Sequence, residues 1–218
     1  MTALHIFDMD GTLLRETTAS REISRRLGHT ATLETLETTF AAGQLTTAEF
    51  AVAIHRLWDE LTDDLVADVV AAAPWIDGIE EVCADITDRG ETAMLISMSP
   101  DFFAHHLYNR GLHIIHASRF PPLPFTTPID PGGILTPTDK IQLTETERAR
   151  RGLATTACVA YGDSLSDEPL FTTLDNTVAV NADQQLEAIA CRTYRGHDLR
   201  EAYTHGRTLL DNHEIEQD

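Results

Sequence analysis

Short apolar segments alternate with helical segments along most of this 218-residue chain, and that alternation restricts the fold more than any other feature. Strands are predicted at residues 3–8, 92–97, 112–117, 156–161 and 177–180. Helices are predicted at residues 78–89, 100–110, 138–151, 166–173, 183–190 and 198–212, and a Pro- and Gly-rich loop at 119–137. Strands separated by helices favour an α/β fold with a doubly wound parallel sheet. Such sheets bind ligands beyond the carboxyl ends of their strands.

The segment between the first predicted strand and Gly78 follows a different pattern, because it is helical and contains no strand signal. Apolar residues recur there three and four positions apart, at Leu33, Leu36 and Phe40 and again at Phe50, Ile54 and Leu57. Thr46 and Glu49 match a capping box at a helix start. We therefore expect residues 1–14 and 78–218 to form the α/β core, with residues 15–77 inserted after the first strand as a small helical cap.

Charge and composition exclude several classes of function. The formal net charge is −19, and so acidic a surface repels the phosphate backbone of nucleic acids. Acidic surfaces also occur in salt-adapted proteins, and that explanation stays open. No apolar run reaches the roughly 18 residues of a membrane span, and Asp8 and Asp10 interrupt the only apolar stretch that resembles a signal peptide. We expect a cytoplasmic protein with no membrane partner, whose three scattered cysteines are buried and reduced.

Two aspartates follow the first predicted strand, in the sequence Phe-Asp-Met-Asp-Gly-Thr at residues 7–12. Alternate residues of an extended segment point to the same side, so Asp8 and Asp10 can face one pocket. A plain strand-ending turn is the other interpretation, because Asp and Gly are common in turns.

A second pair of acids follows the predicted strand at 156–161, where Gly162 leads into Asp163 and Asp167. Their spacing of four places both carboxylates on one face if a helix begins there, although acids also favour helix starts for dipole reasons alone. Carboxylates gathered at neighbouring strand ends repel one another unless a cation neutralises them. An all-oxygen set of this kind suits Mg²⁺, which binds one or two carboxylates together with a phosphate.

Two further residues stand out at the expected ligand-binding edge. Ser97 supplies a hydroxyl at the end of the predicted strand 92–97. Lys140 is the single lysine among 16 cationic residues. A compact ammonium can pair with a carboxylate and a phosphate in a tight site, where a planar guanidinium fits less well.

In their order along the chain, these elements resemble the four motifs of the haloacid dehalogenase superfamily. Residues 8–12 resemble the first motif, Ser97 the second, Lys140 the third, and residues 162–167 the fourth. The helical insert resembles the cap of the phosphoserine-phosphatase-like branch. The resemblance implies a Rossmann-like core and a Mg²⁺-dependent phosphomonoester hydrolase that acts through an aspartyl-phosphate on a small phosphorylated metabolite.

The resemblance also implies a role for each matching residue. Asp8 is the expected nucleophile, and Asp10 the expected general acid and then base. Asp8, Asp163 and the backbone carbonyl of Asp10 are expected to hold Mg²⁺, with Asp167 supporting them. The residues expected to bind the phosphoryl group are Ser97, Lys140, Gly11 and Thr12.

The sequence defines the identity of the substrate less well than it defines the type of reaction. Glu16, Arg56, Met98 and Ser99 are candidate substrate contacts by the same resemblance. The Ser-Met-Ser-Pro segment at 97–100 and Ser166 depart from the phosphoserine-phosphatase pattern. A sugar, polyol or biosynthetic-intermediate phosphate therefore stays open beside phosphoserine. Phosphoryl transfer to an alcohol and a non-catalytic phosphate-binding regulator are the remaining alternatives, and the oligomeric state cannot be deduced.

Overall fold

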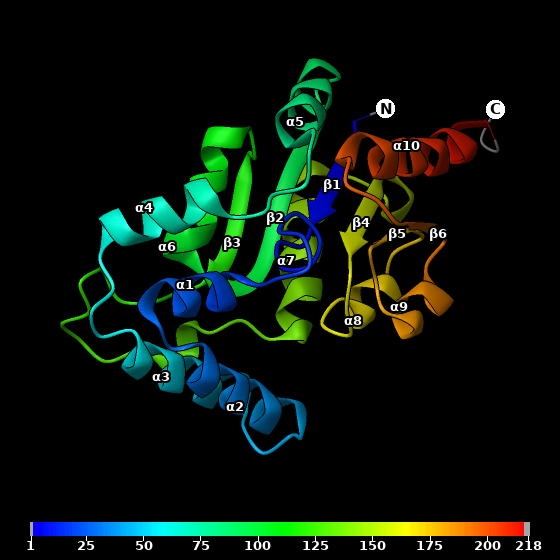
Figure 1. Cartoon of the computed structure of the whole chain (residues 1–218). Helices are drawn as coiled ribbons and strands as arrows, with labels where there is room; N and C mark the ends of the chain where they lie inside the picture. Colours follow the sequence, from blue (N-terminus) through cyan, green and yellow to red (C-terminus); the bar gives the residue numbers. More distant parts are fainter. Residues whose placement is uncertain (1, 216–218) are drawn as a thin grey trace.

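The computed structural model describes residues 2–215 and contains a parallel six-stranded sheet in the order β3-β2-β1-β4-β5-β6 (Figure 1). Its strands are β1 (Leu4–Phe7), β2 (Thr92–Pro100), β3 (Ile114–Ser118), β4 (Cys158–Gly162), β5 (Asn176–Val180) and β6 (Arg192–Tyr194). The strand order runs outward from β1 in both directions, which confirms the predicted doubly wound α/β sheet.

The helices are α1 (Ala19–Leu27), α2 (Thr30–Ala41), α3 (Thr47–Leu57), α4 (Asp63–Ala72), α5 (Ile79–Asp88), α6 (Asp101–Ala104), α7 (Pro137–Arg151), α8 (Glu168–Phe171), α9 (Gln184–Ile189) and α10 (Leu199–Ile215). Short 3-10 helices lie at η1 (His105–Arg110), η2 (Pro131–Gly133) and η3 (Thr155–Ala157). Within residues 2–215, no helix has both the length and the apolar character that crossing a membrane requires.

Helices cover both faces of the sheet, and the residues of β1 divide between them. Phe7 packs into the larger core, with residues of α5 and α10. Leu4 and Ile6 face the opposite core, with residues of α8 and α9. Alternate side chains of a strand point to opposite faces, so a strand covered on both sides is mainly apolar, and in β1 His5 is the one polar residue.

The segment between β1 and β2 contains only helices, as expected for residues 15–77. A capping box formed by Thr46 and Glu49 starts α3, and Thr62 caps α4. Figure 1 shows α1, α2 and α3 beyond the carboxyl ends of the central strands. Apolar residues of these helices, such as Leu33 and Ile54, belong to the same buried cluster as Phe7. The division into a separate cap and core stays a prediction.

Three local expectations were wrong. Strand β6 was missed, because its first two residues are exposed and give no apolar run. The helix expected at 166–173 covers only 168–171, for a reason that lies in the site. Cys83 and Cys158 are buried free thiols as expected, but Cys191 is exposed.

Candidate active site

The two acidic motifs meet because β1 and β4 are neighbours in the sheet. Phe7 pairs with Tyr161, so Asp8 and Asp163 leave the sheet side by side at its carboxyl edge. One carboxylate oxygen from each of Asp8, Asp163 and Asp167 lies within 4.8 Å of the others. The sequence-based expectation that the acids converge is therefore matched by their positions.

Two glycines leave the space that this convergence needs. A Cβ atom on Gly11 would lie 2.0 Å from Oδ2 of Asp163, and Gly11 also has a φ of +79°, which glycine adopts most readily. A Cβ atom on Gly162 would lie 2.5 Å from Cγ of Asp167. In each motif, an aspartate carboxyl group thus occupies the space that a side chain on the glycine would fill.

Lys140 lies between two of these carboxylates. It comes from the first turn of α7, which a capping box of Thr136 and Asp139 holds at its start. Its Nζ atom donates to Oδ1 of Asp8 and to Oδ1 of Asp167, each at 2.6 Å. The Lys140 side chain is 1% exposed, so this double ion pair is shielded from solvent.

Asp167 holds the loop after β4 in a turn instead of a helix. Its Oδ2 atom accepts hydrogen bonds from the backbone N–H groups of Asp163, at 3.1 Å, and Ser164, at 3.4 Å. Helix α8 therefore begins only after Asp167, which explains why the predicted helix at 166–173 starts too early.

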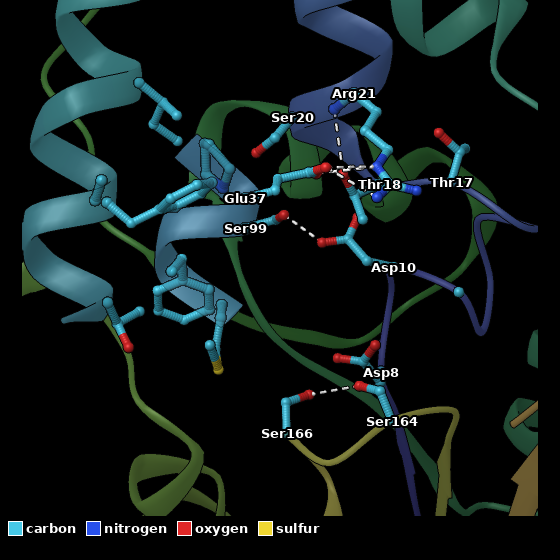
Figure 2. Close-up of a pocket in the computed structure, with 18 of the residues that line it drawn as sticks. Asp8, Asp10, Thr17, Thr18, Ser20, Arg21, Glu37, Ser99, Ser164 and Ser166 are labelled. Carbon is cyan, nitrogen blue, oxygen red and sulfur yellow. Dashed lines mark hydrogen bonds and ion pairs between the residues drawn. The ribbon is translucent and has the colours of Figure 1, made fainter. Parts of the chain in front are cut away.

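Asp10 lies beside this cluster and is held from two other elements. Its Oδ1 atom accepts a hydrogen bond of 2.8 Å from the backbone N–H of Ala19, at the start of α1. The hydroxyl of Ser99, near the end of β2, donates to Oδ2 (Figure 2). Ser97 accepts a bond of 3.1 Å from the Ser99 N–H and so supports this arrangement from below.

Burial controls the ionisation of the site. Burial raises the pKa of Asp163 to about 9, with a further contribution from Asp8. Burial also raises the pKa of Asp8, to about 7, against the opposing charge of Lys140. The pKa of Asp10 is raised by burial too. Burial alone would lower the pKa of Lys140, but Asp167 and Asp8 raise it overall, so the ammonium stays charged.

The residues present fit a divalent cation. Three oxygen-bearing acids face one ammonium, which leaves an excess of negative charge in a buried space. Within the described chain, Oδ1 of Asp163 is buried without a hydrogen-bond partner. A buried carboxylate oxygen without a partner is costly unless a cation or water reaches it, and an all-oxygen set is what Mg²⁺ prefers.

A cavity of about 430 Å³ opens above these acids, beneath α1, α2 and α3 (Figure 2). Its lining includes Asp8, Asp10 and Asp163. The cap-side lining consists of Glu16, Thr17, Thr18, Ser20, Arg21, Glu37, Phe40, Thr47, Phe50, Ala51 and Ile54. A volume of this size accommodates a small-molecule ligand.

The structure brings half of the predicted substrate and phosphate contacts to the lining of this cavity. Gly11, Glu16, Met98 and Ser99 line it. Among the predicted phosphate contacts, Ser97, Thr12 and Lys140 are buried residues that do not line the cavity.

Arg56 is not brought to the site, because it lies on the wrong side of α3. The cavity-facing residues of that helix are Thr47, Phe50, Ala51 and Ile54. They lie three and four residues apart and therefore form one stripe of the helix. Arg56 follows Ile54 by two residues, about 200° around the helix, and is exposed.

Two oppositely charged residues in the cavity lining were not predicted from the sequence. Arg21 and Glu37, from α1 and α2, form a bidentate ion pair in its lining. No local pattern marks them, because they are 16 residues apart on different helices. The apolar residues Phe40, Phe50 and Ile54 did carry a signal, because their spacing of three and four residues predicted helices in this segment.

Comparison with known proteins identifies relatives of this chain. A 149-residue stretch, 66% of this chain, is 30% identical to "Phosphoserine phosphatase SerB1" of Mycobacterium tuberculosis, of which it covers 46%. The chain thus spans about half the length of that curated relative.

Solved structures share the fold at lower identity. A substrate-bound phosphoserine phosphatase superposes with a TM-score of 0.78 at 21% identity, covering 94% of this chain and 98% of that one. A hydrolase of Salmonella enterica serovar Typhi superposes with a TM-score of 0.79 at 19% identity, covering 89% and 68%. The sequence model of the haloacid dehalogenase-like hydrolases matches residues 6–172, which include all four motifs. This chain therefore belongs to the haloacid dehalogenase-like hydrolase family.

Proposed function

We propose that this protein is a Mg²⁺-dependent phosphomonoester hydrolase, which transfers the phosphoryl group of a small metabolite first to Asp8 and then to water. The observation that carries the proposal is the buried cluster of Asp8, Asp163, Asp167 and Lys140 at the floor of the cavity, with Asp10 beside it. Binding a phosphate ester needs cations, but binding alone does not need a second, separately held carboxylic acid.

In the first half of the reaction, a carboxylate oxygen of Asp8 attacks phosphorus and the bond from phosphorus to the ester oxygen breaks. Asp10 gives a proton to the departing alcohol oxygen. Burial raises the pKa of Asp10, which favours the protonated form that a general acid needs. The bonds from Ala19 and Ser99 hold the Asp10 carboxyl in a fixed orientation toward the cavity.

In the second half, Asp10 accepts a proton from water as the water oxygen attacks phosphorus. The bond from phosphorus to the Asp8 oxygen breaks, and inorganic phosphate leaves with Asp8 restored. Lys140 stabilises the negative charge of Asp8 and of the phosphoryl group bonded to it, because its ammonium is fixed beside the Asp8 carboxylate. Asp167 keeps that ammonium in place by the second ion pair.

The proposed Mg²⁺ ligands are Asp8, Asp163 and the backbone carbonyl of Asp10, with Asp167 orienting the loop that carries Asp163. When bound, the ion neutralises the acids and withdraws charge from the phosphoryl oxygens. Asp163 would need the ion most in order to ionise, since its pKa is raised to about 9, compared with about 7 for Asp8.

The relatives support the reaction class and suggest its substrates. One curated relative is named a phosphoserine phosphatase, and a fold neighbour is a phosphoserine phosphatase with bound substrate. We therefore propose a small phosphorylated metabolite as substrate. The cavity volume of about 430 Å³ agrees with a leaving group of that size.

A phosphoenzyme assay tests the proposal. Wild-type protein given Mg²⁺ and a panel of phosphate esters should release inorganic phosphate, and EDTA should stop the release. Rapid quenching should reveal a hydroxylamine-sensitive phosphoryl group on the protein. Asp8→Asn should abolish both signals, whereas Asp88→Asn, the same change at an exposed position of α5, should keep them. Turnover by Asp8→Asn at the wild-type rate would refute the nucleophile.

A further inference from the structure

One wall of the cavity, formed by α2, α3 and the segment between β3 and α7, is apolar. Phe40 of α2 and Phe50 of α3 have ring centroids 5.2 Å apart, and Ile54 continues the same wall. Phe120 and Ile134, from the segment between β3 and α7, line the cavity as well. A leaving group that reaches this wall from the acids meets hydrocarbon and aromatic surface, which favours apolar groups over strongly hydrated ones.

The cation that borders this space is already paired. Of the described residues that line the cavity, only Arg21 carries a positive charge. Its Nε atom lies 2.9 Å from Oε1 and its Nη2 atom 2.9 Å from Oε2 of Glu37, which is the bidentate geometry of a carboxylate complex. Figure 2 shows Glu37 reaching Arg21 above Asp10. A substrate carboxylate would have to compete with Glu37 for this guanidinium.

The remaining charges make that competition harder. Glu16 and Glu37 line the cap side against the single Arg21, so the cap side is negative before any substrate enters. Lys140 is not available to the leaving group, because it is buried between Asp8 and Asp167. A carboxylate on the leaving group would therefore add negative charge where no free cation among the described lining residues balances it.

From these observations we infer that the preferred substrate is the phosphate ester of a mainly apolar alcohol without a carboxylate, and not phosphoserine. The inference rests on the proposed function and specifies its substrate class. The wall of Phe40, Phe50 and Ile54 would favour an apolar leaving group. The Arg21–Glu37 pair would disfavour phosphorylated amino acids, because it leaves their carboxylate without a partner.

Three esters of unactivated primary alcohols test the inference on the wild-type protein with Mg²⁺: benzyl phosphate, O-phosphoserine and O-phosphoethanolamine. We expect kcat/KM for benzyl phosphate to exceed that for phosphoserine at least about tenfold. A smaller ratio, or a preference for phosphoserine, would overturn the inference and leave the proposed hydrolase intact. A preference for phosphoethanolamine would overturn it in favour of a cationic leaving group. No turnover of any ester would contradict the proposed function itself.

A variant that removes the negative charge of the ion pair provides the second test. Glu37→Gln removes the carboxylate that holds Arg21, so the ratio of phosphoserine to benzyl phosphate in kcat/KM should rise several-fold. Glu60→Gln is the matched control, because Glu60 is exposed and does not line the cavity. Equal effects of both variants, or no effect of Glu37→Gln, would exclude the ion pair as a determinant of specificity.

Discussion

Removing the ammonium of Lys140 should damage both stability and activity, because the same atom serves both. Lys140→Met keeps the length and apolar stem of the side chain. It deletes the donor of two hydrogen bonds of 2.6 Å, to Asp8 and Asp167, in a place where the lysine is 1% exposed. Two buried carboxylates then lose their nearest cation.

The expected cost can be worked out from these contacts. Removing one partner of a buried ion pair typically destabilises a protein by about 3–5 kcal/mol, mainly because the other partner is left uncompensated. A charge-assisted hydrogen bond contributes about 1.5–3 kcal/mol, so two of them give a similar figure. With a urea m-value of about 2 kcal/mol/M, the midpoint of unfolding should fall by about 2 M.

The assay is urea unfolding in EDTA, followed by phosphate release with Mg²⁺. The double variant Lys140→Met/Asp167→Asn separates the two roles of the ammonium. It removes one of the two unpaired charges, so it should recover part of the lost stability. It should recover no activity, because the Lys140 ammonium beside Asp8 is still missing. We expect kcat to stay at least about a thousandfold below wild type in both variants, a loss of about 4 kcal/mol.

Two results would refute this reasoning. If Lys140→Met unfolds within about 0.3 M urea of wild type, the double ion pair does not support the fold. If the double variant is less stable than the single variant, the cost does not arise from uncompensated carboxylates. Either result would require a different account of the buried cluster.

Three further outcomes are expected. The pKa of Asp163 in the folded protein, about 9, lies above the ordinary value near 4, so between these pH values the metal-free folded protein binds more protons than the unfolded chain. The free energy of unfolding should therefore fall as the pH rises from about 4 to about 9. Asp163→Asn should remove the part of that fall above about pH 7 in EDTA melting curves, whereas Asp8, with its pKa raised to about 7, keeps a fall at lower pH. It should also abolish stabilisation by Mg²⁺ at pH 8; an unchanged pH slope above pH 7 would contradict the assignment. Gly11→Ala should lower activity at least about tenfold, because its Cβ would overlap Asp163. Gly43→Ala is the control, because Gly43 has a similar φ of +70° and no atom within 4 Å of an added Cβ; it should cost only about 1 kcal/mol of stability. Equal effects of the two variants on activity would show that the overlap is irrelevant. Arg207→Met should destabilise the fold by about 2–4 kcal/mol, since Arg207 pairs at 2.8 Å with the buried Glu91 at the amino end of β2, and should leave kcat unchanged; a changed kcat would show that this distant network reaches the site.

Much of the fold and of the acidic cluster could be predicted from the sequence, because both depend on local patterns. The apolar strands and the helices between them fix a parallel sheet, and in such a sheet residues that follow neighbouring strands meet at one edge. Asp8 and Asp163 could therefore be placed together without coordinates. The single lysine in an arginine-rich chain pointed to Lys140 as a buried partner of these acids. Among the described strands, β6 was the one missed, because a three-residue edge strand with two exposed side chains leaves no apolar pattern.

The substrate-facing half of the cavity was decided by tertiary structure. A shift of one residue turns a side chain by about 100° around a helix, so a family resemblance that is about one residue out of register selects the wrong face. Arg56 is exposed for this reason, although Ile54 lines the cavity. The pairing of Arg21 with Glu37 depends on how α1 packs against α2, which no local pattern encodes. The sequence by itself thus determined where the acids gather and with which cation, because strand ends in a parallel sheet share an edge. Only the packing of the helices decided which charges remain free to meet a substrate.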